Sequence, residues 1–230
     1  MTLLVTVEGN IGSGKTTLLQ DIKHLSFAKP HVVVFENVTE WLNKKDNHQQ
    51  SILELFYKDQ EKYSYIFQSY VLFSRVSHLL HAIKENPDGI VICERCHLTD
   101  LMVFAKSLHE LEKLNDMEWS VYQDWHKMIR QLFTLRMDAV IYNRASPDIC
   151  LQRICKRSRT GESSIGLDYL SLLHTKHDDW LVHSNTPLDI SVEEPTQHVM
   201  IMDGNVDYSE ESQRQEQLSQ IVQFVNRLLA

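Results

Sequence analysis

Residues 9–17 read Gly9-Asn10-Ile11-Gly12-Ser13-Gly14-Lys15-Thr16-Thr17, which matches the phosphate-binding pattern G-x-x-x-x-G-K-[ST] of a P-loop. An apolar run at residues 3–7 precedes this loop and an amphipathic helical pattern follows it, which is the context that the motif requires. Three of the 7 glycines of the chain lie in the loop, where they let backbone N–H groups close around a phosphate. The sequence therefore predicts that residues 9–17 bind the phosphates of a nucleotide.

Two side chains of the loop have expected roles. Lys15 would reach the β- and γ-phosphates of the nucleotide, and the hydroxyl of Thr16 would face a Mg²⁺ ion. The helix that begins near Lys15 would add the positive end of its dipole to the same site. We therefore expect a nucleoside triphosphate and magnesium to bind here.

The composition restricts the class of protein. The chain has 230 residues, of which 43% are hydrophobic and 23% are charged, as in an ordinary globular domain. The net charge of −8 argues against a general binder of nucleic acid or of anionic membranes, and no apolar run approaches the ~18 residues of a membrane span. No signal or transit peptide precedes the first strand, so a cytoplasmic location is expected. We predict one domain over residues 1–230.

The cysteines do not indicate a metal or redox site. Cys93 and Cys96 have C-x-x-C spacing, but a zinc or redox role would need a second ligand pair or a thioredoxin-like context, and neither is present. The other two cysteines are Cys150 and Cys155. We interpret all four as thiols in a reducing compartment.

Strand and helix patterns alternate along the chain. Short apolar runs rich in β-branched residues predict buried parallel strands at 3–7, 32–35, 90–93, 139–142 and 199–202. Helical patterns cover about 15–27, 51–57, 61–85, 98–112, 117–136, 147–158, 166–184 and 209–229, and residues 185–198 have the composition of an exposed loop. This order predicts a P-loop, doubly wound, three-layer α/β fold with a five-stranded parallel sheet and helices on both faces.

Charged residues follow two of the predicted strands. Ligands of parallel α/β sheets bind beyond the carboxyl ends of the strands, so Glu36 would lie beside the P-loop. A carboxylate there can take a proton from an attacking hydroxyl, although a solvated loop acid is the alternative interpretation. Glu94 and Arg95 end the third strand, where they suit Mg²⁺ binding and charge stabilisation, or else form a structural ion pair.

A basic cluster predicts a lid over about residues 153–164. Arg153 and Arg157 share one helix face, and Lys156 and Arg159 lie beside them. The Gly- and Ser-containing stretch 160–164 follows, so the guanidinium groups would close over a transferred phosphoryl group and neutralise its charge. A solvated basic helix end is the alternative interpretation.

One polar residue lies in an aromatic stretch. Gln68 falls within residues 56–78, where aromatic side chains are frequent. Its amide presents a donor and an acceptor side by side, which can match the edge of a nucleobase.

These motifs together resemble the deoxyribonucleoside kinases, the family of the insect multisubstrate enzyme and of the vertebrate deoxycytidine, deoxyguanosine and mitochondrial thymidine kinases. The resemblance rests on Glu36-x-Val38-x-x-Trp41, Leu55-Phe56-Tyr57-Lys58-Asp59, Phe67-Gln68-Ser69-Tyr70, Glu94-Arg95 and Arg153-x-x-x-Arg157-x-Arg159-x-x-Glu162. It extends to Asp179-Trp180-Leu181, with a weaker match at Asp203 and Asp207-Tyr208. The chain is thus expected to transfer a phosphoryl group from ATP to the 5′-hydroxyl of a deoxyribonucleoside, for nucleotide salvage.

The resemblance implies a role for each matching residue. These implied roles are as follows: Glu36 is the general base, Arg95 supports it, Glu94 and Thr16 hold Mg²⁺, Gln68 reads the base, Trp41 and Phe104 pack on the base, Tyr57 and Glu162 bind the 3′-hydroxyl, Arg157 and Arg159 are lid arginines, and Arg153, Asp207 and Tyr208 lie near the donor adenine. Two positions depart from the family pattern. Asn37 replaces a common proline, which would loosen Glu36, and Cys96 replaces a common serine.

Three positions bear on the choice of nucleoside. Arg75 and Asp100 match positions where the cytidine- and purine-type members of the family carry an Arg–Asp pair, which would crowd the methyl group of thymine. Val71 favours the opposite preference, because the residue at this position resembles that of the thymidine-accepting members. On balance the resemblance implies a preference for purine deoxynucleosides and deoxycytidine over thymidine. It also implies a homodimer formed through the long helices near 61–85 and 117–136.

Two other functions remain as alternatives. A nucleoside monophosphate kinase of the thymidylate type has the same fold, but its phosphate acceptor needs no general base such as Glu36. A GTP-dependent switch protein is suggested by Asn43-Lys44-Lys45-Asp46, which matches the guanine-reading pattern N-K-x-D. That segment lies only ~27 residues past Lys15 and follows the second strand instead of a late one, so we interpret it as a solvated turn.

Overall fold

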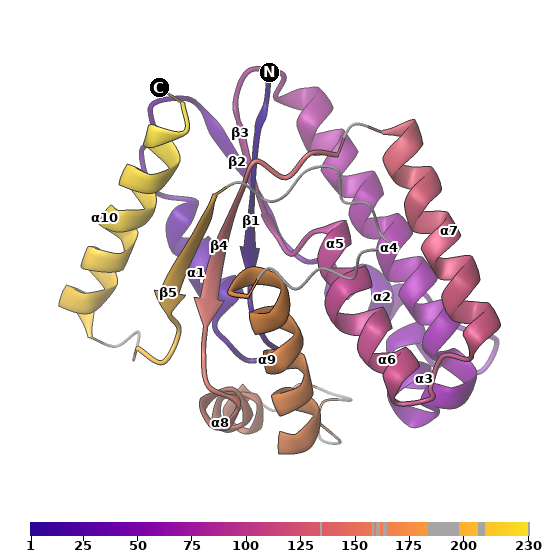
Figure 1. The fold of residues 1–230 in the computed structure, drawn as a ribbon. Helices are drawn as coiled ribbons and strands as arrows, with labels where there is room; N and C mark the ends of the chain where they lie inside the picture. Colours follow the sequence, from indigo (N-terminus) through magenta and orange to yellow (C-terminus); the bar gives the residue numbers. More distant parts are fainter. Residues whose placement is uncertain are drawn as a thin grey trace.

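The computed structural model describes residues 1–133, 135–157, 159, 162, 165–183, 198–206 and 210–229 (Figure 1). Its strands form one sheet in the order β2-β3-β1-β4-β5. They are β1 (Leu3–Glu8), β2 (His31–Val34), β3 (Ile90–Glu94), β4 (Ala139–Arg144) and β5 (Val199–Asp203), and every neighbouring pair is parallel. This sheet confirms the predicted five-stranded parallel fold.

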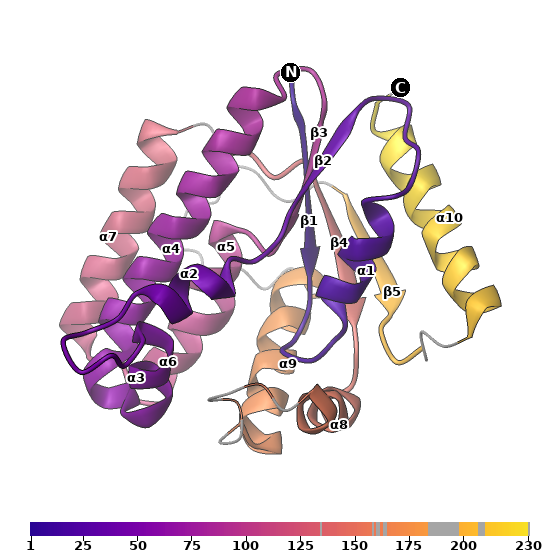
Figure 2. The same ribbon diagram turned by 180° about the vertical axis from the view of Figure 1, so that it is seen from behind.

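Helices cover both faces of the sheet, as Figures 1 and 2 show from opposite sides. They are α1 (Lys15–Ile22), α2 (Val38–Asn43), α3 (Ile52–Lys58), α4 (Gln60–Glu85), α5 (His97–Thr99), the π-helical turn η1 (Asp100–Ala105), α6 (Lys106–Glu110), α7 (Asp116–Leu132), α8 (Pro147–Arg157), α9 (Leu167–Leu181) and α10 (Glu211–Arg227). Helices α1 and α10 lie on one face, whereas α4, α7 and α9 lie on the other.

The two faces are packed by alternate residues of the same strands. Val5 and Val7 of β1 point into the core shared with α1 and α10, whereas Leu4 packs into the larger core shared with α4 and α7. Side chains of a strand alternate between the faces of a sheet, so a strand covered on both faces needs apolar residues at successive positions. This requirement explains the near-continuous apolar runs by which the strands were predicted.

The helices of the structure differ from the predicted ones in several places. The helix predicted over 15–27 ends at Ile22, because Leu25 and Phe27 reach the core from an irregular segment that has no helical period. The helix predicted over 98–112 is divided into α5, η1 and α6. Helix α2 was not predicted, since it has only 6 residues and its start depends on the Asn37 side chain, which accepts a hydrogen bond from the Glu40 N–H.

Several sequence-based predictions have a simple structural outcome. Asn43, Lys44 and Lys45 are exposed at the end of α2, as expected for a solvated turn. The loop predicted over 185–198 lies, apart from its last residue, outside the described residues. Among the helices that the structure describes, none combines the length and hydropathy that a bilayer crossing demands.

Candidate active site

A cavity of about 770 Å³ opens at the carboxyl ends of the strands. It is lined by most of the site residues expected from the sequence, namely Ile11, Gly12, Gly14, Lys15, Thr16, Thr17, Glu36, Trp41, Tyr57, Gln68, Val71, Arg75, Glu94, Arg95, Asp100, Phe104, Arg153, Arg157, Arg159 and Glu162. Gly9, Asn10 and Ser13 belong to the same loop but do not line the cavity. Asp207 and Tyr208 lie outside the described residues. The fold thus brings together side chains that are up to 151 positions apart in the chain, from Ile11 to Glu162.

The P-loop is tightly packed against its surroundings. Gly12 has φ +81°, and a Cβ atom there would approach the Cys150 carbonyl oxygen of α8 to 2.5 Å, so no larger residue fits. The Lys15 ammonium donates to the Asn10 carbonyl oxygen at 2.7 Å. Burial, with a contribution from the charge of Arg95, lowers the pKa of Lys15 to about 7. A bound phosphate would supply the negative charge that this buried ammonium group needs.

Thr16 and Glu94 meet across the loop. The Thr16 hydroxyl donates a hydrogen bond that is shared between the two carboxylate oxygens of Glu94, at 2.9 and 3.1 Å. A hydroxyl and a carboxylate are the oxygen ligands that suit Mg²⁺ when nucleotide phosphates and water complete its coordination. The residues present therefore fit a magnesium ion bound together with a nucleotide, although within the described ranges no three or more His, Cys, Asp or Glu side chains are arranged so that they could hold a metal ion by themselves.

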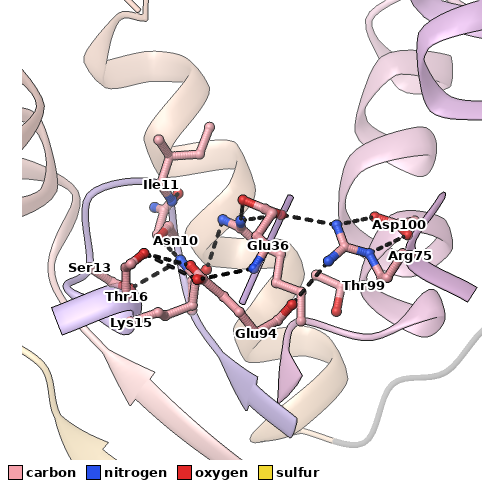
Figure 3. Close-up of polar contacts among 12 residues, drawn as sticks. Asn10, Ile11, Ser13, Lys15, Thr16, Glu36, Arg75, Glu94, Thr99 and Asp100 are labelled. Carbon is pink, nitrogen blue, oxygen red and sulfur yellow. Dashed lines mark hydrogen bonds and ion pairs between the residues drawn. The ribbon is translucent and has the colours of Figure 1, made fainter. Parts of the chain in front are cut away.

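Glu36 lies at the centre of an ionic network, which Figure 3 shows. Arg95 donates to both of its carboxylate oxygens, at 2.9 and 2.8 Å, and Arg75 donates to one of them at 2.9 Å. Burial acts to raise the pKa of Glu36, but the charges of Arg95 and Arg75 outweigh it and hold the pKa at about 2. Glu36 is therefore a fully ionised carboxylate at neutral pH.

Arg75 connects this carboxylate to a second one. Its guanidinium donates to both oxygens of Asp100, at 2.8 and 3.1 Å, and to the Glu94 carbonyl oxygen at 3.0 Å. Asp100 is completely buried at the start of η1. The expected Arg75–Asp100 pair is thus present. Its contact with Glu36 was not foreseen, because nothing in the sequence spacing indicates that α4 delivers a side chain to the end of β2.

Aromatic residues from α2, α3 and α4 form the neighbouring wall of the cavity. Phe67 stacks on Phe56 with ring centroids 4.4 Å apart and meets Trp41 edge-on at 5.8 Å. Gln68 is buried, and its side-chain carbonyl oxygen has no hydrogen-bond partner among the described residues. A buried amide is stabilised when it gains a partner, so this position suits a polar edge of a ligand. Phe104 covers the Arg95 guanidinium at 5.0 Å.

The arginines of the predicted lid have different environments. Arg157 donates to both carboxylate oxygens of Glu162, at 2.8 and 2.7 Å, and Arg159 lies 3.4 Å from the same carboxylate. Arg153 instead donates to three backbone carbonyl oxygens, those of Ser13, Gly204 and Val206. It thereby connects the P-loop to the segment that precedes Asp207. Of the predicted flexible stretch 160–164, only Glu162 is described.

The two residues that depart from the family pattern have different environments. Asn37 caps α2 and also donates to the Glu40 carboxylate at 2.9 Å, so the residue after Glu36 is held by the helix that it starts. Cys96 is a buried free thiol that does not line the cavity, and burial raises the pKa of its thiol. Tyr169 of α9 lines the cavity without having been indicated by any sequence motif, because a single tyrosine in an amphipathic helix looks like a core residue.

The comparison with known proteins follows this geometry. The sequence pattern of the deoxynucleoside kinase family matches residues 5–227. A probable deoxycytidine kinase of fowlpox virus is 32% identical over 225 residues, which are 97% of this chain and 88% of that protein. The deoxycytidine kinase of Mus musculus is 34% identical, with coverage of 90% and 85%. A mitochondrial deoxyguanosine kinase of Xenopus laevis is 33% identical, with coverage of 79% and 74%. The chain therefore belongs to the deoxynucleoside kinase family, enzymes that phosphorylate a nucleoside with a nucleotide as phosphate donor.

Proposed function

We propose that this deoxynucleoside kinase uses ATP and Mg²⁺ to phosphorylate the 5′-hydroxyl of its substrates, and that it prefers purine deoxynucleosides and deoxycytidine to thymidine. The observation that carries the proposal is the carboxylate of Glu36, which lies between two arginines in a cavity that it shares with the P-loop. A phosphate acceptor would not need this base, whereas a hydroxyl acceptor does.

Glu36 acts as the general base in this proposal. Its pKa of about 2 keeps it ionised and able to accept a hydrogen bond from the 5′-hydroxyl in the ground state. Arg95 and Arg75 fix both carboxylate oxygens, so the orientation of the base is set before the substrate binds. Proton transfer is then favoured only as the hydroxyl oxygen bonds to phosphorus and its own acidity rises.

The donor side supplies positive charge. Lys15 would contact the β- and γ-phosphates, and Thr16 with Glu94 would hold the magnesium ion, which neutralises phosphate charge when it is bound. Arg157 and Arg159 are proposed lid residues that exchange the Glu162 carboxylate for the transferred phosphoryl group. Glu162, released from the arginines, would then bind the sugar 3′-hydroxyl together with Tyr57.

The substrate preference rests on the base side of the cavity. Gln68 offers an amide to the edge of the base, with Trp41 and Phe104 as packing surfaces. The Arg75–Asp100 pair is fully formed and buried, and we propose that this fixed polar boundary would crowd the thymine methyl group. The relatives are named deoxycytidine and deoxyguanosine kinases, which agrees with a preference for these nucleosides over thymidine. Val71 is buried beside this boundary.

We also propose a homodimer in the cytoplasm. Helices α4 and α7 carry exposed apolar side chains on neighbouring surfaces, namely Ile66, Phe73, Met117, Val121, Trp125, Met128 and Leu132. Phe73 and Trp125 contact each other across the two helices, with ring centroids 5.6 Å apart. Apolar surface of this kind is a common feature of subunit interfaces. The buried free thiols Cys93, Cys96 and Cys150 suit a reducing compartment.

A phosphorylation panel tests the proposal. The purified enzyme is given ATP and Mg²⁺ with each of the four deoxynucleosides and, separately, with each nucleoside monophosphate. We expect higher kcat/KM for deoxyadenosine, deoxyguanosine and deoxycytidine than for thymidine, and no transfer to the monophosphates. Thymidine as the best substrate would refute the proposed preference, and transfer to a monophosphate would refute the hydroxyl acceptor.

A further inference from the structure

Arg95 adopts a backbone conformation that is unusual for its residue type. Its φ of +60° lies in the left-handed region, as does that of only two other non-glycine residues, Gln49 and Glu112, in the part of the chain that the structure describes. A residue with a side chain persists there only when its surroundings fix it, and such positions cluster at functional sites. The Arg95 N–H donates to the Val7 carbonyl oxygen at 3.1 Å, which fixes one side of the turn.

Thr99 fixes the other side of this turn. The N–H of Cys96 donates to the Thr99 hydroxyl oxygen at 3.1 Å. The Cys96 thiol lies 3.6 Å from the same oxygen, a weaker contact than a serine hydroxyl would make. Thr99 is therefore the principal side chain that closes the turn in which Arg95 lies.

The Thr99 hydroxyl is itself oriented by Glu8. It donates to Glu8 Oε1 at 2.7 Å, and the Thr6 hydroxyl donates to the same oxygen at 2.7 Å. A hydroxyl has one proton, so donating it to Glu8 directs a lone pair towards the Cys96 N–H. Glu8 and Thr99 are both completely buried, which excludes water as a competing partner.

We propose that Glu8 and Thr99 are positioning residues for Arg95, holding the left-handed turn from which its guanidinium reaches Glu36 at 2.8 Å. The inference rests on the role proposed above for Arg95. Because Glu8 ends β1 and directly precedes the P-loop, one carboxyl group connects the loop for the phosphate donor to the arginine on the acceptor side. Neither residue touches the cavity itself.

Glu8 acts in this proposal through its acceptor oxygen and not through its charge. Both hydrogen bonds go to Oε1, and Oε2 has no partner among the described residues. Burial raises the pKa of the Glu8 carboxyl group, which favours the neutral acid with Oε1 as its carbonyl oxygen. Glutamine can present the same oxygen to both threonines.

The test compares matched variants at both positions, by kcat and KM for deoxycytidine and ATP. Thr99→Val keeps the shape and loses the hydroxyl, so we expect kcat to fall by about 10- to 100-fold through misplacement of Arg95, with KM for the nucleoside within about twofold. Thr99→Ser restores the hydroxyl, and kcat should return to within about threefold of the wild type. Glu8→Gln should also stay within about threefold, whereas Glu8→Met should behave like Thr99→Val.

Several outcomes would overturn the inference. A normal kcat in Thr99→Val, a Thr99→Ser variant as impaired as Thr99→Val, or a folded Glu8→Gln variant that loses tenfold would each do so. A deoxycytidine-induced rise in melting temperature verifies that each variant is folded. Thr99→Ala, which loses the same hydroxyl, takes the place of any valine variant that does not fold.

An Arg95→Lys variant separates this inference from the proposed role of Arg95. Full turnover in Arg95→Lys would refute that role. An impaired Arg95→Lys beside a normal Thr99→Val would refute only the positioning by Thr99 and Glu8.

Discussion

The two arginine-containing regions of the cavity are built in opposite ways. On the acceptor side, the side chains of Arg75 and Arg95 are only 8% and 6% exposed, and Arg75 alone reaches acceptors from three different elements or loops. In the predicted lid, Arg157 and Arg159 are 34% and 40% exposed, and both share the single carboxylate of Glu162. One region is a closed network, whereas in the other two partly exposed arginines share one buried carboxylate.

This difference follows from the energetics of ion pairs. Breaking a buried pair leaves an unpaired charge in a poor solvent, so the buried network is retained only as a whole. Arg157 and Arg159 remain partly exposed to solvent, so they can leave Glu162 for another anion at a smaller cost than the buried arginines can leave their partners. We infer that the acceptor side is preformed and orients the general base Glu36. The lid arginines, in contrast, can leave Glu162 and bind a phosphate.

The largest expected effect comes from the centre of the buried network. Glu36→Gln keeps the shape of the side chain and removes the proposed base, so turnover should fall by ~10²–10⁴-fold. Nucleoside affinity, measured by titration calorimetry, should be largely kept. Near-normal turnover in the variant would contradict the assignment of Glu36 as the base.

The lid arginines are expected to act mostly in the transition state. Arg159→Ala should lower kcat by about 10²-fold while KM for the nucleoside changes much less, because charge on the transferred group is greatest during transfer. Hydrogen exchange at residues 153–164 should slow when nucleoside and a non-hydrolysable donor analogue are both bound. Unchanged exchange together with unchanged turnover would show that this segment is not a lid.

The Arg75–Asp100 pair can be removed from the network as a unit. The double variant Arg75→Met with Asp100→Ala removes both charges and opens space beside the base, so thymidine should gain about tenfold or more in kcat/KM relative to deoxyadenosine. Absolute kcat should fall for every substrate, because Glu36 loses one of its two arginine partners. Arg75→Met alone is the matched control, and it should be the more impaired variant, since Asp100 is left buried without its partner. An unchanged thymidine-to-deoxyadenosine ratio in the double variant would exclude the pair as the selector.

The smallest effect concerns the pH dependence of donor binding. Lys15 has a pKa of about 7 in the free enzyme, so it loses its charge as the pH rises through 7. The phosphates of ATP favour the ammonium form of Lys15, so Lys15 takes up a proton when ATP binds above pH 7. The dissociation constant for ATP should increase by roughly tenfold between pH 6 and 8, with Glu36 ionised throughout. Calorimetry in buffers of different ionisation enthalpy measures the proton uptake, and a pH-independent affinity would contradict it.

The sequence was sufficient for the parts of the molecule that depend on local pattern. The strands were predicted from apolar runs because a parallel strand buried on both faces cannot tolerate polar residues at successive positions. The P-loop was predicted because few residue types other than glycine permit its backbone, with φ of +148°, +81° and +96° at its three glycines. Glu36 and Glu94 were placed at the cavity by the rule that strand ends meet ligands.

Other features were decided only by the tertiary structure. That Arg75 donates to both Glu36 and Asp100, and that Glu8 reaches Thr99, depends on how α4, β1 and the turn after β3 are packed together. A long polar side chain can take many rotamers, and its partner is chosen by which buried acceptors remain after the core has packed. The sequence by itself therefore determined the sheet, the phosphate loop and the identity of the charged residues, whereas packing determined which charges meet.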